Sequence, residues 1–139
     1  MDELIVERKL DSLYRCINRI NEKCPANAQE LSADIDLQDV IVLNLSRAVQ
    51  LCVDLASHLL SDTDATPPNT MGETFELLSV QKIIDDELAL RLKKSVGFRN
   101  LAVHNYDALN WDIVYAVATK HLDGFRKFAE ALTLRLDKK

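Results

Sequence analysis

Apolar residues recur along the chain at steps of three and four, the spacing that places them on one face of an α-helix. From about residue 2 to 21 the series comprises Val6, Leu10, Leu13, Ile17 and Ile20. A second series follows the possible N-caps Asp34 and Asp36 and comprises Ile41, Leu45, Ala48, Cys52, Leu55 and Leu59. This second segment, which reaches about residue 60, carries apolar residues on its other sides as well. The pattern predicts an amphipathic first helix and a second helix at the centre of the fold.

The second half of the chain continues the pattern. A short helix is predicted over about 73–84, with Phe75, Leu78 and Ile83 pointing inward. A longer helix over about 86–104 has its apolar packing at Leu88, Leu92, Val96 and Val103. Asn110 is expected to cap a last helix to about residue 136, with the series Trp111, Tyr115, Ala118, Leu122, Phe125, Ala129 and Leu132. Segments 24–32 and 61–72 have the composition of loops, so the sequence predicts an all-α, antiparallel bundle of four to five helices.

The composition agrees with a single domain over residues 1–139. The chain is 47% hydrophobic and 28% charged, and its three Gly and three Pro leave few helix breaks. A net charge of −5 gives no general attraction to nucleic acid, so any RNA contact has to be local and sensitive to salt. The three cysteines lack a Cys-x-x-Cys spacing, and no stretch has the form of a secretory signal or a membrane helix. We therefore expect a cytoplasmic protein with no membrane partner.

The candidate chemistry lies in residues 98–106, Phe-Arg-Asn-Leu-Ala-Val-His-Asn-Tyr, at the end of the predicted 86–104 helix. A guanidinium is permanently charged and forks onto phosphate oxygens, and an imidazole takes or gives a proton near neutral pH. Arg99 and His104 together therefore suit phosphate-ester chemistry. Helical geometry separates them by about 140° around the axis, whereas Asn100 and His104 share a face. Arg99 would have to reach across the helix, or the partner of His104 would come from a second copy of the chain.

A structural interpretation of the same residues stays open. Arg99 and His104 near a helix C-terminus complement the helix dipole, and Tyr106 would pack in the following turn. The upstream basic residues also complement the dipole, yet with Arg99 they form the one basic patch beside the motif; they are Arg91, Lys93 and Lys94.

Other polar features carry weaker signals. Asp54 and His58 are four residues apart and could share a hydrogen bond, which is more typical of a structural pair than of a catalytic one. His121 receives no role. Segment 61–72 is long enough to contact a partner or gate a site, and equally fits a plain connector.

The sequence resembles the HEPN-fold toxins of the HepT type. Their pattern of Arg, a polar residue, three more residues, His, any residue and Tyr is met without departure by Arg99, Asn100, His104 and Tyr106. The surrounding run Val-Gly-Phe-Arg-Asn-Leu-Ala-Val-His-Asn-Tyr is similar too, as are Phe-Glu-Leu-Leu at 75–78 and Asp-Asp-Glu-Leu at 85–88. With Leu-Gln-Asp-Val-Ile-Val-Leu-Asn-Leu at 37–45, the resemblance covers nearly the whole chain.

This resemblance implies a helical homodimer with a metal-independent endoribonuclease site at its interface and no cofactor. Arg99 would contact the phosphate and the transition state, Asn100 would support it, and His104 would be the general acid or base. The ribose 2′-hydroxyl of an mRNA or tRNA would attack the adjacent phosphate, which requires proton removal, proton delivery and charge stabilisation. Two copies of the chain would supply two histidines.

The resemblance also implies a partner. HepT-type toxins of type VII-like toxin–antitoxin systems are neutralised by MntA, a nucleotidyltransferase antitoxin that transfers AMP to the Tyr of the motif. AMP on Tyr106 would place charge and bulk two residues from His104 and block RNA. Two alternatives stay open: a non-catalytic helper that binds nucleotide or substrate for a minimal nucleotidyltransferase, and a packing role for Arg99 and His104.

Overall fold

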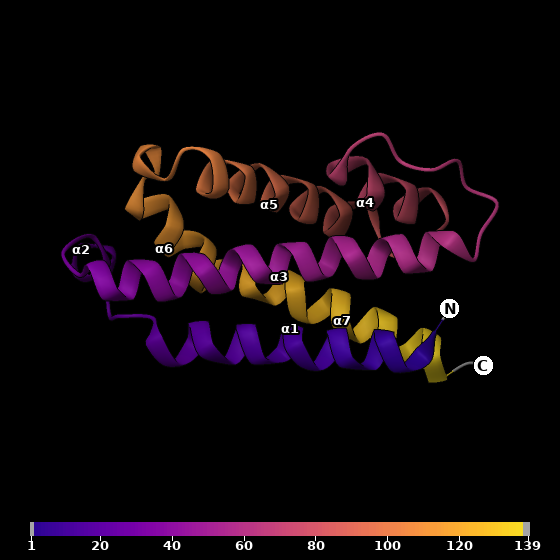
Figure 1. Ribbon diagram of the computed structural model, residues 1–139, viewed down its shortest axis with the longest axis horizontal. Coiled ribbons are helices and arrows are strands. Elements are labelled where there is room, and N and C mark those ends of the chain that lie inside the picture. The colour runs from indigo at the N-terminus through magenta and orange to yellow at the C-terminus, as the bar shows by residue number, and fades with distance from the viewer. Residues whose placement is uncertain (1, 138–139) are drawn as a thin grey trace.

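The computed structural model describes residues 2–137, and every regular element in that range is helical (Figure 1). The α-helices are α1 (Glu3–Lys23), α2 (Ala28–Ser32), α3 (Ile35–Ser61), α4 (Met71–Val80), α5 (Asp86–His104), α6 (Trp111–Lys120) and α7 (Leu122–Asp137). A single 3₁₀ turn, η1 (Tyr106–Ala108), joins α5 to α6. The predicted all-α, antiparallel bundle is confirmed.

Helix α3 forms the centre of the bundle. It packs against α1 on one side and against α4 and α5 on the other, and these neighbours run alongside it in Figure 1. The core includes the fully buried side chains of Leu45, Leu55, Phe75 and Phe128. Helix α3 does meet the length and hydropathy of a membrane helix, which the sequence reasoning did not anticipate. Half of its most apolar stretch is buried inside the bundle, as in the core helix of a soluble protein.

Capping residues account for where the main helices begin. The carboxylate of Asp34 accepts a hydrogen bond from the amide of Leu37 at 3.1 Å, which selects Asp34 as the N-cap of α3. Asp85 caps α5 in the same way, and Asn110 caps α6 as predicted. The predicted range of 86–104 for α5 is confirmed because its cap and its apolar spacing agree.

The four to five helices expected from the sequence become seven α-helices in the described range, for two reasons. The predicted loop 24–32 contains the short helix α2, whose N-cap is Asn27. The predicted single last helix is wrong, because α6 ends at Lys120 and α7 begins at Leu122. Helix α6 packs on α2, whereas α7 packs on α1 and α5, and a straight helix could not meet both surfaces.

One predicted packing residue and one predicted pair are also wrong. Val103 is 53% exposed, so it does not contribute to the core. Asp54 accepts hydrogen bonds from Lys9 at 3.3 Å and from Gln50 at 3.0 Å, in place of the proposed contact with His58. Asp54 therefore links α1 to α3 and has a structural role.

Candidate functional site

The motif residues lie at the end of the bundle where α5, η1 and α6 meet the beginning of α3 (Figure 1). Helix α5 ends at His104, and the amide of Asn105 still donates to the carbonyl of Leu101 at 2.8 Å. Asn105 then leaves the helical conformation with φ −151° and ψ 63°. This bend turns the chain back, so that Tyr106 faces α3 and does not continue along α5.

Tyr106 is held by two neighbours from distant parts of the sequence. Its hydroxyl donates a hydrogen bond to Oδ1 of Asp39 on α3 at 2.9 Å. Its ring lies edge-on to the ring of Trp111 on α6, with 5.9 Å between the ring centroids. Burial, followed by the hydrogen bond and the charge of Asp39, raises the pKa of Tyr106 to about 12. The phenol therefore stays protonated at neutral pH.

Arg99 is directed toward α4. Gly72 allows α4 to approach α5 closely, since a Cβ at this position would lie 3.1 Å from Cγ of Lys93. The neighbouring Met71 places its sulfur 3.9 Å from Nη1 of Arg99, and the same nitrogen donates to Oδ1 of Asn100 at 3.2 Å. Asn100 therefore accepts a hydrogen bond from Arg99, although its position on the helix face had suggested His104 as its partner.

His104 is exposed on the last turn of α5. Within residues 2–137 its imidazole forms no hydrogen bond or ion pair with another side chain. Both ring nitrogens are thus accessible to a substrate or to another copy of the chain. The structure places all four predicted residues in one region, but it directs Arg99 and Tyr106 to different neighbours and leaves His104 facing solvent.

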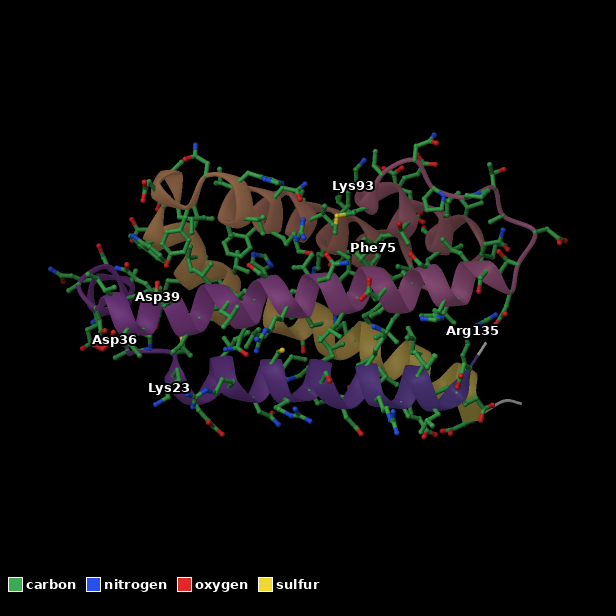
Figure 2. All side chains as sticks on the ribbon, viewed as in Figure 1. Lys23, Asp36, Asp39, Phe75, Lys93 and Arg135 are labelled. Carbon is green, nitrogen blue, oxygen red and sulfur yellow. The ribbon has the colours of Figure 1, made fainter. Side chains whose placement is uncertain are left out.

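Two of the four residues in the predicted basic patch are neutralised. Arg91 pairs with Glu87 at 3.0 Å, and Lys93 pairs with Glu76 of α4. Figure 2 labels Lys93 above Phe75, at the junction of α4 with α5. Among the described residues, Lys94 and Arg99 form no ion pair. The positive charge available near His104 in one chain is therefore small.

A pocket of about 600 Å³ lies on the neighbouring face of α5, between α5, α6 and α7. Its walls are largely apolar and include Phe98, Leu101, Ile113 and Val114, and His121 also lines it. None of the four motif residues lines it. Within residues 2–137 no group of three or more His, Cys, Asp or Glu side chains could hold a metal ion.

The sequence reasoning missed Asp39 and Met71. Asp39 is 67 positions from Tyr106, and Met71 is 28 positions from Arg99. Local spacing carries no information about such contacts, which exist only because α3, α4 and α5 pack together. In the sequence, Asp39 is one of several polar residues at the beginning of α3, and nothing local distinguishes it from the others.

Comparison with known proteins identifies the family to which this chain belongs. A family model described as Ribonuclease HepT-like matches residues 13–132, which include the whole motif. The chain belongs to the HepT-like ribonuclease family. The resemblance to HepT-type toxins that Arg99–Tyr106 carried is therefore confirmed.

Two named nucleases are similar to this HepT-like chain in sequence, and a solved HEPN toxin is similar in fold. It is 36% identical over 132 residues to mRNA nuclease HepT of Shewanella oneidensis, covering 95% of this chain and 98% of that protein. It is 24% identical over 115 residues to tRNA nuclease HepT of Aphanizomenon flos-aquae, covering 83% and 78%. A solved structure of tri-AMPylated Shewanella oneidensis HEPN toxin in complex with MNT antitoxin has a TM-score of 0.88 and 35% identity, covering 96% of this chain and 99% of that one.

Proposed function

We propose that this HepT-like chain is the toxin of a toxin–antitoxin pair, an endoribonuclease that acts in the cytoplasm and is silenced by AMP transfer to Tyr106. The observation that carries the proposal is the placement of Arg99, His104 and Tyr106 at one end of α5, in a family whose relatives are named mRNA and tRNA nucleases. The partner would be an MntA-type nucleotidyltransferase, since related HEPN toxin is known in complex with MNT antitoxin.

The chemistry follows from what these groups can do. The 2′-oxygen of the ribose attacks the adjacent phosphorus, the bond to the 5′-oxygen breaks, and a 2′,3′-cyclic phosphate and a 5′-hydroxyl form. His104 accepts or supplies a proton, and the Arg99 guanidinium stabilises the charge that develops on the phosphoryl oxygens. Neither role requires a metal ion.

A second copy of the chain supplies what one copy lacks. The reaction needs one group that removes a proton and another that delivers one, yet the motif holds a single histidine. Leu90, Gly97, Leu101 and His104 follow one another along α5 at steps of seven, four and three, which places them on one face of the helix. Leu90 is 53% and Leu101 is 39% exposed, and Gly97 has no neighbouring atom within 4 Å of the position a Cβ would take.

This α5 stripe (Leu90, Gly97, Leu101 and His104) suits a two-fold homodimer. The space above Gly97 would admit a side chain of the second copy, and the two leucines would lose their contact with water. Two-fold symmetry would bring both His104 side chains toward one cleft, and each Arg99 guanidinium would have to leave Met71 and reach around α5 to join them. The cleft would then hold twice the positive charge of one chain.

Modification of Tyr106 would act on this cleft in two ways. AMP adds a phosphodiester charge where the RNA phosphate has to bind, and the adenosine occupies space beside His104. The modified oxygen also has no proton to donate, so its hydrogen bond to Asp39 is lost. AMP on Tyr106 therefore opposes substrate binding through both repulsion and occupancy.

The test is RNA cleavage by purified unmodified protein, with mRNA and tRNA substrates, comparing wild type with His104→Ala and Arg99→Ala. We expect each substitution to lower the cleavage rate by about 10²-fold or more. His58→Gln is the matched control, because His58 lies at the far end of α3 and should leave the rate unchanged. Cleavage that persists in His104→Ala would contradict the catalytic role, and no cleavage by any form would favour the helper function.

A further inference from the structure

A carboxylate lies in contact with the hydroxyl group that the proposed function modifies. Asp39 Oδ1 is 2.9 Å from the Tyr106 hydroxyl, which donates its proton toward it. Figure 2 labels Asp39 on the part of α3 that faces the α5–α6 end of the bundle. Among residues 2–137, no Lys, Arg or His forms an ion pair with Asp39, so its charge is not shared with a cation. The carboxylate is therefore available to accept the phenolic proton.

Stabilisation of α3 does not account for Asp39. Asp34 already caps the helix, and Asp36 supplies the acidic residue of its first turn. Asp39 lies beyond that turn and is exposed except for its contact with Tyr106. Among the described residues, the bond from Tyr106 is the one side-chain hydrogen bond that Asp39 forms.

We propose that Asp39 is the base that takes the proton of Tyr106 during AMP transfer. This inference rests on the proposed function and assigns a residue to it. The Tyr106 oxygen attacks the α-phosphorus of ATP, the bond from that phosphorus to the oxygen bridging to the β-phosphate breaks, and pyrophosphate leaves with the electron pair. The phenolic proton passes to the Asp39 carboxylate and then to water.

The electrostatic surroundings of Tyr106 agree with this role. With its pKa near 12, the phenol supplies little phenolate at neutral pH, so transfer depends on an acceptor in contact with its proton. Asp39 is the charged group that acts on the phenol from α3, and α6 contributes the uncharged ring of Trp111. Along the chain, the nearest titratable residues are His104, two positions before Tyr106, and Asp107, directly after it.

Transfer of AMP would also displace the tyrosine from α3. The phosphodiester carries a negative charge at the position where the proton had been, opposite the Asp39 carboxylate. Like charges at hydrogen-bond distance repel. The modified side chain would therefore move away from Asp39.

The experiment measures the initial rate at which the purified nucleotidyltransferase partner labels the full chain from α-phosphate-labelled ATP, between pH 6.5 and 9.5. Asp39→Asn keeps the size of the side chain and a hydrogen-bond acceptor but removes the base. We expect its rate at neutral pH to fall by about 10²-fold and to recover by about tenfold per pH unit as phenolate forms without help. Asp39→Glu should restore part of the rate.

The controls separate this inference from its alternatives. Asp36→Asn removes a carboxylate from the same helix, one turn earlier, and should keep the wild-type rate; Tyr106→Phe should take no label. A loss of labelling rate in Asp39→Asn that does not change with pH would indicate that Asp39 only holds Tyr106 in position, and would overturn its role as base. Labelling of Asp39→Asn at the wild-type rate would assign the base to the partner. Absence of label on wild type would instead overturn the proposed function.

Discussion

Tyr106 offers a measurement at the scale of one residue. Its pKa is raised to about 12, above the ordinary value of 10.0, so ionisation is harder in the folded chain than in the unfolded chain. The stabilisation from its protonated, hydrogen-bonded form is complete below about pH 10 and is lost as pH rises through about 12. Wild type should therefore lose more stability than Tyr106→Phe between these values.

Denaturant unfolding of both proteins at a series of alkaline pH values checks this expectation. Asp39→Asn should move the ionisation of Tyr106 toward 10, because the carboxylate charge and its hydrogen bond contribute to the shift. The tyrosinate absorbance of each variant, with that of Tyr106→Phe subtracted, reports the midpoint. An unchanged midpoint in Asp39→Asn would mean that burial alone sets the pKa.

The motif residues could be named from the sequence, whereas their neighbours could not. Arg99, His104 and Tyr106 fall within eight consecutive positions, so a short pattern finds them. The contacts of Tyr106 with Asp39 and of Arg99 with Met71 join residues that only packing brings together. Positions on the helix face also paired Asn100 with His104, but Asn100 accepts a hydrogen bond from the long Arg99 side chain instead.

At the scale of the element, predictability depended on whether a local signal marked each boundary. Helix α5 was predicted correctly because Asp85 caps its beginning and apolar periodicity runs through it. The break at His121 has no such signal, since the apolar steps of three and four continue across it. Its cause is the different packing of α6 on α2 and of α7 on α1 and α5, which depends on the assembled bundle.

Gly97 allows the proposed interface to be tested on α5 itself. It lies in the helix interior, and nothing approaches within 4 Å of the place where a Cβ would stand. Gly97→Ala should therefore stabilise the isolated monomer by about 0.5–1 kcal/mol, because alanine loses less backbone entropy in a helix. If a second copy packs on the α5 stripe, the added methyl group should also weaken dimerisation.

Denaturant unfolding at low protein concentration measures the first effect, and sedimentation equilibrium measures the second. Gly124→Ala is a matched control, since its Cβ would make ordinary contacts of 3.9 Å with Leu88 and 4.0 Å with Arg91 inside the molecule. It should leave dimerisation unchanged. If the Gly97→Ala monomer is more stable but dimerises as the wild type does, the dimer interface lies elsewhere.

For the whole molecule, the distribution of charge favours a site shared by two copies. The chain has a net charge of −5, and Arg91 and Lys93 are neutralised within it. Among the described residues of this patch, the cations without an ion pair are Lys94 and Arg99, and Arg99 is directed toward α4. An RNA substrate would need more positive charge than that, and the proposed two-fold axis through the α5 stripe would double it.

Mixing wild type with an inactive variant tests whether two copies share the site. If one cleft needs both His104 side chains, a dimer of wild type with His104→Ala lacks one of the two proton-transfer groups and is inactive. Random pairing of equal amounts makes about one quarter of the dimers fully wild type, so co-refolding should leave about one quarter of the cleavage given by the same total amount of wild type. The control pairs wild type with His58→Gln, which should keep full cleavage. Cleavage of about one half would show that Arg99 and His104 act within one protomer, in which case the guanidinium has to leave Met71 and Asn100 when RNA binds.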